Sequence, residues 1–299
     1  MITIVGSINM DLIASTERLP EPGETVTGSD FATAPGGKGA NQALAARRAG
    51  ASVRMAGAVG DDTFAGEALA LLDAAGADLG AVQRLAGPTG IAMILVGVDG
   101  ENMIAVIPGA NGKFSAEDAR AAVERMTAGD TLLLQMEIPE PAVAAALDAA
   151  RERSVTSILN IAPLTAAVER LAPKADIVIA NETEFARLSG RHAGTAAEVS
   201  AELAALHART GQAMIVTLGA DGVAWARGGE TGHVASLKVT PVDTVGAGDT
   251  FCGYLAQGLD SGLAFPDAVR RAAVAGALAC LKPGAQPSIP ESAEVEARL

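Results

Sequence analysis

The sequence predicts an α/β fold, built on a doubly wound, mostly parallel β-sheet with helices on both faces. Two observations predict it. Short, near-continuous apolar runs alternate with longer helical stretches, a pattern typical of parallel strands that are buried on both faces. The chain has 299 residues, of which 49% are hydrophobic and 19% charged. It can therefore bury a large core, and this composition excludes a disordered chain.

Each expected element follows from its own stretch of sequence. The apolar runs are predicted to be strands of the main sheet: residues 2–5, 53–59, 131–134, 155–159, 177–179 and 214–218. The stretches between and after them are predicted to be helices: residues 40–49, 116–126, 142–153, 196–209, 250–259 and 265–281. The Asp-Asp-Thr sequence at 61–63 is typical of the start of a further helix. We expect residues 1–299 to form a single domain.

Two segments, 12–34 and 90–107, interrupt this alternation. Both contain β-branched residues and turn signals (Pro22-Gly23 and Asp99-Gly100), and neither shows a helical pattern. We expect residues 12–33 and 90–107 to pair as a small β-sheet lid. The run 91–96 is apolar at every position, so a lid that covers a pocket with one face exposes an apolar patch on the other.

Charge and composition exclude several classes of partner. The chain has 22 basic and 35 acidic residues, a net charge of −13, and only 3% aromatic residues. A broad nucleic-acid surface needs clustered basic residues or stacking aromatics, so no nucleic-acid partner is expected. No apolar run approaches the ~20 residues of a membrane span, and the start of the chain does not resemble a signal peptide. Two cysteines, Cys252 and Cys280, suit a reducing compartment. We expect a cytoplasmic protein that binds small molecules.

A glycine-rich loop, PGGKGANQ at 35–42, opens the helix expected at 40–49. Its glycines let a ligand approach the backbone, and a helix N-terminus favours anions or hydroxyl oxygens. It is not a Walker A loop, because Gly39 follows Lys38 where Ser or Thr is required. It is not a dinucleotide fingerprint either, because Gln42 occupies the position of the third glycine. The loop is either a structural turn or a binding loop.

A second small-residue segment, DTVGAGDT at 243–250, precedes another helix. The amides of Gly246, Ala247 and Gly248 can converge into an anion-binding nest at the positive end of that helix. Asp249 then falls in the first helical turn, beside the place of a transferring phosphoryl group. An isolated Asp there is usually a helix cap. The three small residues before it favour a general base next to a hole for the developing charge.

Other polar residues also follow predicted strands. Asn181 can cap a short helix or, with Glu184, provide an outer-shell hold on Mg²⁺ and phosphates. Asn9 and Asp11 have the period-two spacing that places both side chains on one face of a strand, which suggests recognition of hydroxyl groups. Glu137 is a further candidate, although taken alone it is expected to be a solvated loop residue.

Segments 36–42 and 243–249 resemble the two signature motifs of the ribokinase-like (PfkB) carbohydrate kinase family. The resemblance covers essentially the whole chain, and its further matching segments occur in the order of the family: 6–11, 108–111, 135–137, 181–184, 217–219 and 284–288. It implies ATP-dependent phosphorylation of the 5-hydroxyl of D-ribose, giving D-ribose 5-phosphate. A kinase for another sugar or for a nucleoside is the alternative within the family.

The resemblance also implies residue roles, with ATP, Mg²⁺ and K⁺ as cofactors. Asp249 would be the base and Gly246, Ala247 and Gly248 the anion hole. Sugar hydroxyls would be held by Asn9, Asp11, Gly37, Lys38, Asn41, Glu137 and Asp249. The nucleotide site would comprise Asn181, Glu184, Thr217, Gly219, Ala220, Gly222 and Gly248. Oxygens for K⁺ would come from Asp243, Val245, Ala279, Lys282, Gly284 and Ser288.

One departure from the family pattern, Ala273, concerns the nucleotide site. Ala273 occupies a position where some members carry a polar residue near the adenine, which puts nucleotide contacts there in doubt. The resemblance also implies that the lids of two subunits clasp each other in a homodimer, which would bury the apolar patch on each lid.

Two classes of protein compete with a kinase. A sugar sensor that binds without phosphorylating needs neither Asp249 nor Glu184, so the presence of both argues against it. A nicotinamide-dependent oxidoreductase would carry Gly-x-Gly-x-x-Gly after the first strand, where Gly6-Ser7-Ile8 stands instead.

Overall fold

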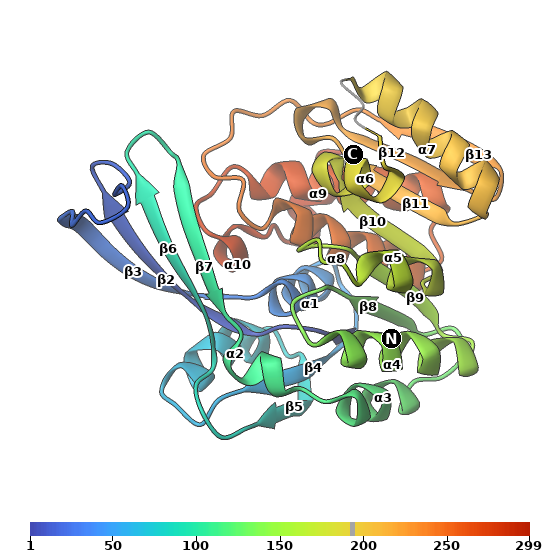
Figure 1. Ribbon diagram of the computed structural model, residues 1–299. Coiled ribbons are helices and arrows are strands. Elements are labelled where there is room, and N and C mark those ends of the chain that lie inside the picture. The colour runs from blue at the N-terminus through green and yellow to red at the C-terminus, as the bar shows by residue number, and fades with distance from the viewer. Residues whose placement is uncertain (192–194) are drawn as a thin grey trace.

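The structure is a computed structural model that describes residues 1–191 and 195–299. Its centre is a nine-stranded sheet in the order β13-β12-β11-β10-β9-β8-β1-β4-β5 (Figure 1). The strands from β11 to β5 run parallel, and β12 and β13 add an antiparallel hairpin at one edge. The strands are β1 (Ile2–Val5), β4 (Val53–Val59), β5 (Asp78–Arg84), β8 (Thr131–Leu134), β9 (Thr156–Asn160), β10 (Ile177–Asn181), β11 (Ala213–Thr217), β12 (Val223–Arg227) and β13 (Glu230–Val234).

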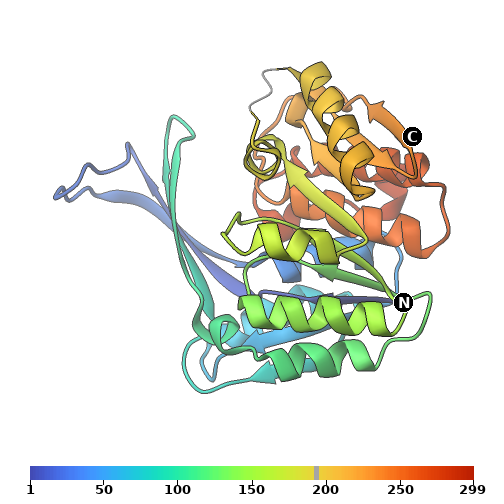
Figure 2. The ribbon, with the colours of Figure 1, turned by 45° about the vertical axis from the view of Figure 1, so that its right-hand side comes forward.

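Helices cover both faces of this sheet, which confirms the predicted fold class (Figures 1 and 2). One face packs against α1 (Lys38–Arg48), α2 (Phe64–Ala74), α8 (Ala247–Asp260) and α9 (Phe265–Ala279), with the short α10 (Ala285–Ser288) and α11 (Ser292–Glu296) beside them. The other face packs against α3 (Ala116–Glu124), α4 (Glu140–Glu152), α5 (Val168–Leu171), α6 (Glu182–Ser189) and α7 (Ala196–Thr210). Three short 3₁₀ turns are η1 (Gly109–Lys113), η2 (Ala172–Lys174) and η3 (Gly219–Asp221).

The continuous apolar strands follow from this double cover. Successive side chains of a strand point to opposite faces. Ile4 and Leu133 accordingly belong to the core beneath α1, α8 and α9, whereas their neighbours Val5 and Leu134 belong to the core beneath α3 and α4. Both faces bury their side chains, so the residues on both faces are mostly apolar.

Close packing between α1 and α8 sets the geometry of the candidate site. A Cβ atom on Gly253 would lie 2.5 Å from Cβ of Ala45 and 2.6 Å from the carbonyl oxygen of Gln42. Only glycine allows the helices to approach this closely. The approach brings the first turn of α8 beside the side chains of α1.

A second, four-stranded sheet in the order β3-β2-β6-β7 forms the lid, and it projects away from the body (Figures 1 and 2). Its strands are β2 (Asn9–Thr16), β3 (Gly28–Gly36), β6 (Gly90–Gly97) and β7 (Asn102–Ile107). β2 and β6 are parallel, and the outer pairs are antiparallel. The two excursions thus pair as predicted. The second excursion has its predicted bounds, whereas the first begins at Asn9 and ends at Gly36, outside the predicted 12–33, so Asn9 and Asp11 lie at the base of the lid.

Both faces of the lid carry apolar side chains. Residues paired directly across the strands share a face, so Ile104 and Val106 lie on the face of Asp11. Phe31 and Met93 lie on the opposite face, where they are 63% and 55% exposed. Ile104 and Val106 are 53% and 49% exposed. The apolar run 91–96 therefore contributes to both faces, as the sequence indicated.

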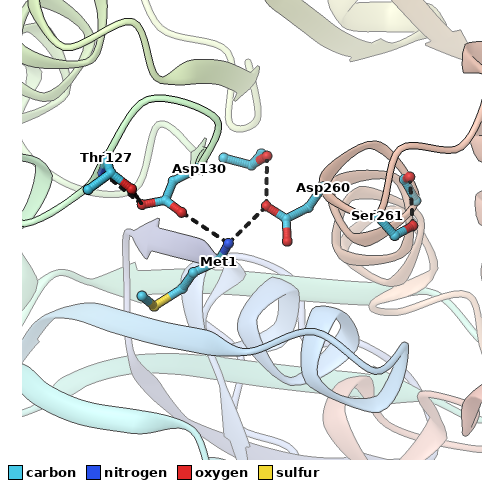
Figure 3. A network of polar contacts seen from close by, with 7 residues as sticks. Met1, Thr127, Asp130, Asp260 and Ser261 are labelled. Atoms are coloured by element: carbon cyan, nitrogen blue, oxygen red, sulfur yellow. Dashed lines mark hydrogen bonds and ion pairs between the residues drawn. The ribbon is translucent and has the colours of Figure 1, made fainter.

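Polar contacts join the first strand to α8 at the end of the sheet opposite the lid (Figure 3). The ammonium group of Met1 donates hydrogen bonds to Asp130, before β8, at 3.1 Å and to Asp260, at the end of α8, at 3.2 Å.

Strands β5 and β13 were not among the elements predicted. Among the described residues, no helix is long and apolar enough to cross a membrane.

Candidate active site

The candidate site lies at the carboxyl ends of the parallel strands, the usual place for ligands in such sheets. A cavity of about 210 Å³ opens there. Side chains that follow several strands reach it, and small residues of the segment before α8 complete its wall. The lining residues are Lys38, Asn160, Ala162, Ile179, Ala180, Asn181, Glu184, Thr217, Thr244, Gly246, Gly248, Asp249 and Cys252.

Asp249 lies in the first turn of α8 and is only 7% exposed. Its two carboxylate oxygens face α1: Oδ2 accepts a hydrogen bond from Nδ2 of Asn41, and Oδ1 accepts one from Nε2 of Gln42, both at 2.9 Å. The side chain does not cap α8, whose N-cap residue is Gly246. A buried carboxylate with free lone pairs at a cavity wall is placed to accept a proton.

The glycine-rich loop packs directly on the base of the lid. A Cβ on Gly36 would lie 2.3 Å from Oδ2 of Asp11, and one on Gly37 would lie 2.7 Å from the backbone nitrogen of Asn9. Gly37 also has φ of +87°, a left-handed conformation that favours glycine. The loop is therefore more than a turn, because its glycines bring α1 beside Asn9 and Asp11.

Two buried asparagines, Asn9 and Asn41, differ in whether their side-chain oxygens have hydrogen-bond partners. Asn9 is 3% exposed, and its Oδ1 accepts a hydrogen bond of 2.7 Å from Nδ2 of Asn111, which is itself bonded to the backbone of Ile8. Asn41 donates to Asp249, but its buried Oδ1 has no partner among the described residues. A buried acceptor without a partner costs free energy unless a ligand supplies the donor, and a sugar hydroxyl can do so.

Glu137 is not the solvated loop residue expected of an isolated Glu. Its Oε2 accepts hydrogen bonds from Oγ of Ser7 at 2.6 Å and from the backbone N–H of Lys38 at 3.1 Å. Burial raises the pKa of Asp11 to about 7, with the charges of Glu137 and Asp249 adding to this effect. The charge of Asp249, joined by those of Glu137 and Glu184, raises the pKa of Lys38. Lys38 is thus the cation at the centre of an acidic site.

Asn181 and Glu184 form a reciprocal capping box at the start of α6. Oδ1 of Asn181 accepts from the Glu184 amide at 2.8 Å, and Oε2 of Glu184 accepts from the Asn181 amide at 2.9 Å. The capping interpretation of Asn181 is therefore confirmed, and both residues also line the cavity. Within residues 1–191 and 195–299 no three His, Cys, Asp or Glu side chains are grouped to hold a metal ion. Two carboxylates, Glu184 and Asp249, line the cavity, which fits a hydrated Mg²⁺ held mainly by phosphates and water.

A larger, mostly apolar pocket of about 600 Å³ adjoins this cavity. The two share Thr217, Thr244 and Gly248 in their walls. The predicted nucleotide residues Gly219, Ala220 and Gly222 line it, and so does Ala273. Ala247, predicted as an anion-hole residue, lines it as well. Residues that the sequence did not indicate complete the wall: Val223, Ser236, Leu237, Lys238, Val239, Pro241, Phe251, Gly276, Ala277 and Cys280.

The segment before α8 is held against the loop that follows α9. Oδ1 of Asp243 accepts from the Val245 amide at 2.9 Å, and Oδ2 accepts from the Gly284 amide at 2.8 Å. Gly246 has φ of +77°, and a Cβ there would lie 2.8 Å from Cα of Ala285. These contacts bring the predicted anion-hole residues beside the segment carrying three of the other predicted K⁺ ligands: Lys282, Gly284 and Ser288.

Two amides of the predicted anion hole, those of Ala247 and Gly248, differ in their hydrogen bonds. The Ala247 amide donates to the carbonyl of Thr244 at 3.3 Å. The N–H of Gly248 lies in the first helical turn, where no earlier carbonyl of the helix can accept it. Ala279, the remaining predicted K⁺ residue, ends α9, and its carbonyl accepts from the Lys282 amide at 3.5 Å.

The polar residues at or behind this site that were not predicted as site residues include four buried amides: Gln42, Asn111, Gln135 and Asn160. Gln42 donates to Asp249, and Asn111 holds Asn9. Gln135 and Asn160 share a signal that could have found them, since each is a buried amide at the carboxyl end of an apolar strand.

Comparison with known proteins identifies the class of protein. The sequence profile described as "pfkB family carbohydrate kinase" matches residues 1–292, and the chain belongs to this family. It is 36% identical to a ribokinase of Lactococcus lactis over 299 residues, 100% of this chain and 96% of that protein. It is 33% identical to a deoxyribokinase of Salmonella typhi over 291 residues, 97% and 95% of the two chains. A ribokinase of Arabidopsis thaliana, solved with ribose and ATP, superposes with a TM-score of 0.87 at 32% identity, covering 99% of this chain and 97% of that one.

Proposed function

We propose that this carbohydrate kinase transfers the γ-phosphoryl group of ATP to the 5-hydroxyl of D-ribose. The observation that carries the proposal is the position of Asp249. This buried carboxylate lines the polar cavity together with Lys38, and its neighbour Gly248 belongs to the wall that this cavity shares with a pocket large enough for a nucleoside. The likeness to ribokinases over the whole chain, one of them solved with ribose and ATP, supports ribose as the acceptor.

The sugar is held between the lid base and α1. Asn9, Asp11, Asn41 and Glu137 offer acceptors to its hydroxyl groups, and the backbone at Gly37 and Lys38 lies beside them. The unpartnered Oδ1 of Asn41 is the clearest vacant acceptor. ATP occupies the apolar pocket, with its base against Ala273, Phe251 and Ala277 and its phosphates directed past Thr217 and Gly248 into the cavity.

Transfer is an in-line displacement in which positioning and electrostatics do most of the work. Oδ of Asp249 accepts the proton of the 5-hydroxyl as the sugar oxygen bonds to the γ-phosphorus. The bond between that phosphorus and the β,γ-bridging oxygen breaks, and ADP leaves with the electron pair. The Gly248 N–H donates to the transferring group, and the Lys38 ammonium balances its charge. Mg²⁺, when bound near Glu184, supplies further neutralisation of the phosphate charge.

A monovalent cation, K⁺, activates the enzyme. The carboxylate of Asp243 bonds both to the Val245 amide and to the Gly284 amide, and this supports a cation site between the two segments. Oxygens of Asp243, Val245, Ala279, Lys282, Gly284 and Ser288 would hold it. Such an ion orders Gly246 and Gly248 without touching substrate. At constant ionic strength we expect the rate to rise with K⁺ and little with Na⁺; equal rates in both salts contradict the site.

The substrate is tested by a coupled assay of ADP release. Ribose, 2-deoxyribose, fructose, adenosine and uridine are compared at equal concentration, with a reaction lacking acceptor as the blank. We expect the highest kcat/KM with ribose. The likeness to a deoxyribokinase makes 2-deoxyribose the second candidate. A preference for a nucleoside over both pentoses would overturn the proposal.

The enzyme works in the cytoplasm, where ATP is available and Cys252 and Cys280 stay reduced.

The lid also forms the interface of a homodimer. The exposed face with Phe31, Met93 and Met103 supports the interface, because a two-fold arrangement buries identical apolar patches together. Light scattering at micromolar concentration should give the mass of two chains. Met93→Asp with Met103→Asp should give monomers, whereas Asp30→Asn on the same sheet should not. A wild-type mass of one chain contradicts the interface.

A further inference from the structure

A row of buried amide side chains lies behind Asp249. Nε2 of Gln135 donates to Oε1 of Gln42 at 2.7 Å, and Nε2 of Gln42 donates to Oδ1 of Asp249 at 2.9 Å. Both glutamines are fully buried, with 0% of their surface exposed. Gln42 lies on α1, Gln135 follows β8, and Asp249 lies on α8, so the row ties together three elements around the sheet edge.

The chemistry of the groups fixes the direction of this row. A carboxylate only accepts hydrogen bonds, so Gln42 must turn its NH₂ group toward Asp249. Its carbonyl oxygen then faces Gln135, which must in turn present its own NH₂ group. Nε2 of Gln42 also lies 3.3 Å from Oδ1 of Asn160, a second acceptor that favours the same orientation. Reversing either amide would set two acceptors against each other.

Packing holds the far end of the row in place. A Cβ atom on Gly6 would lie 1.9 Å from Oε1 of Gln135, so this side chain occupies space that only glycine leaves free. Oε1 of Gln135 has no hydrogen-bond partner among the described residues. The native structure thus bears the cost of one unsatisfied buried acceptor while Gln135 keeps its NH₂ on Gln42.

The two donors on Asp249 have different relations to substrate. Asn41 bonds to Oδ2, is 6% exposed and has an unpartnered Oδ1 that a hydroxyl group of the proposed sugar can satisfy. Gln42 bonds to Oδ1 and is 0% exposed, and its amide groups are taken up by Asp249, Gln135 and Asn160. With a donor on each oxygen, the plane of the carboxylate cannot turn. With Asn41 alone, it can rotate about a single hydrogen bond.

We propose that Gln42 is a positioning residue for Asp249, and that Gln135 acts through it by setting the direction of its amide. The pair holds the carboxylate in the orientation that meets the sugar hydroxyl. This inference rests on the proposed function of Asp249 as the base. It adds two residues that touch neither sugar nor nucleotide and that act only on the reacting geometry.

Near-isosteric apolar variants test the proposal. Gln42→Met removes the donor to Oδ1, and we expect kcat to fall about 10- to 100-fold, the usual effect of losing a hydrogen bond to a charged group. KM for ribose and for ATP should stay within about threefold, because the sugar and nucleotide contacts remain. Gln135→Met should lower kcat less, by about 3- to 10-fold. Gln212→Met is the matched control: it removes an amide hydrogen bond to the Ala175 carbonyl at the other end of β11.

A double variant tests whether Gln135 acts on Asp249 through Gln42. If Gln135 acts through Gln42, then Gln42→Met combined with Gln135→Met should have the kcat of Gln42→Met alone, within about twofold. Independent, multiplying losses would overturn the relay. Unchanged kcat in a folded Gln42→Met protein, or a loss confined to KM, would overturn the positioning role. The proposed function fails separately, by a wild-type protein that releases no ADP with ribose. Thermal unfolding of each variant shows that it is folded, and Gln42→Asn, which retains an amide donor, should recover part of the rate.

Discussion

The polar cavity lined by Asp249 and the apolar pocket that adjoins it at Thr217, Thr244 and Gly248 have walls of different chemistry. The polar cavity is enclosed by charged and amide side chains whose positions are fixed by hydrogen bonds between α1, the strand ends and α8. The nucleotide pocket is lined by small and apolar residues and by the backbone of η3. Because of this difference, substitutions in the two pockets should act in different ways. The polar cavity should be sensitive to the loss of one polar atom, and the apolar pocket to a change of volume.

The largest expected effect is at Asp249, in the wall of the polar cavity. Asp249→Asn keeps the size of the side chain but removes the base, so kcat should fall by ~10²–10⁴. KM for ribose and ATP should change by no more than a few-fold. Steady-state kinetics check this, with Asp260→Asn at the other end of α8 as the control. Turnover within threefold of wild type would remove Asp249 from the role of base.

The next-largest effect is expected on the KM for ribose alone. Asp11→Ala removes an acceptor at the base of the lid, and KM for ribose should rise about 10- to 100-fold, as for the loss of a hydrogen bond to a charged group. KM for ATP should not change, because Asp11 is not among the residues that line the nucleotide pocket. Asp30→Ala on the neighbouring strand is the control. An unchanged KM for ribose places Asp11 outside the sugar site.

A change of side-chain volume in the apolar pocket should raise the KM for ATP and leave the KM for ribose unchanged. Ala273→Leu adds bulk to the wall without removing a polar group, so KM for ATP should rise about 3- to 10-fold, the usual cost of overfilling a packed site. KM for ribose should stay the same. If both KM values rise together, the two pockets are not independent. If neither moves, ATP does not use this wall.

The smallest effect is on stability and comes from Asp11. Burial raises its pKa to about 7, whereas the unfolded chain has the ordinary value near 3.8. Between these values the folded protein holds a proton that the unfolded chain has lost. The contribution of Asp11 to stability therefore falls as pH rises through this window, and it is lowest above about pH 7.

Asp11→Asn removes this dependence, because Asn is uncharged at every pH. The difference in Tm between variant and wild type should be about 2–6 °C more favourable to the variant at pH 8 than at pH 5. Thermal unfolding at both values checks it, with Asp30→Asn as the exposed control. A difference that does not depend on pH, or that favours the variant more at pH 5, contradicts the buried state of Asp11.

The sequence predicted the interior of the fold better than its edges. Strands such as β8 and β10 are apolar except at one end because both faces are covered, and this pattern can be seen in a single sequence. β5 and β13 lie at the two edges of the sheet and mix polar with apolar residues, so nothing in their composition distinguishes them from loops. Their place is set by pairing with β4 and β12, which only the folded chain shows.

The same limit explains which site residues were missed. Asn9, Lys38 and Asp249 lie in motifs or beside glycines that signal a binding loop. Gln42 was noticed only because it is not a glycine, and its bond to Asp249 joins residues 207 positions apart. Such a contact depends on the close approach of α1 and α8 at Gly253. No local pattern in the sequence reports it.

We propose that Asp249 accepts the proton of the primary hydroxyl of ribose as a phosphoryl group passes to that hydroxyl from ATP. Phosphorus NMR of the reaction with ribose and ATP tests this most directly, because coupling to the adjacent protons identifies the esterified carbon. We expect one new phosphate monoester, on C5, formed in equal amount to ADP and formed ~10²–10⁴-fold more slowly by Asp249→Asn. Phosphate on another hydroxyl, or ADP with inorganic phosphate and no sugar ester, would contradict it.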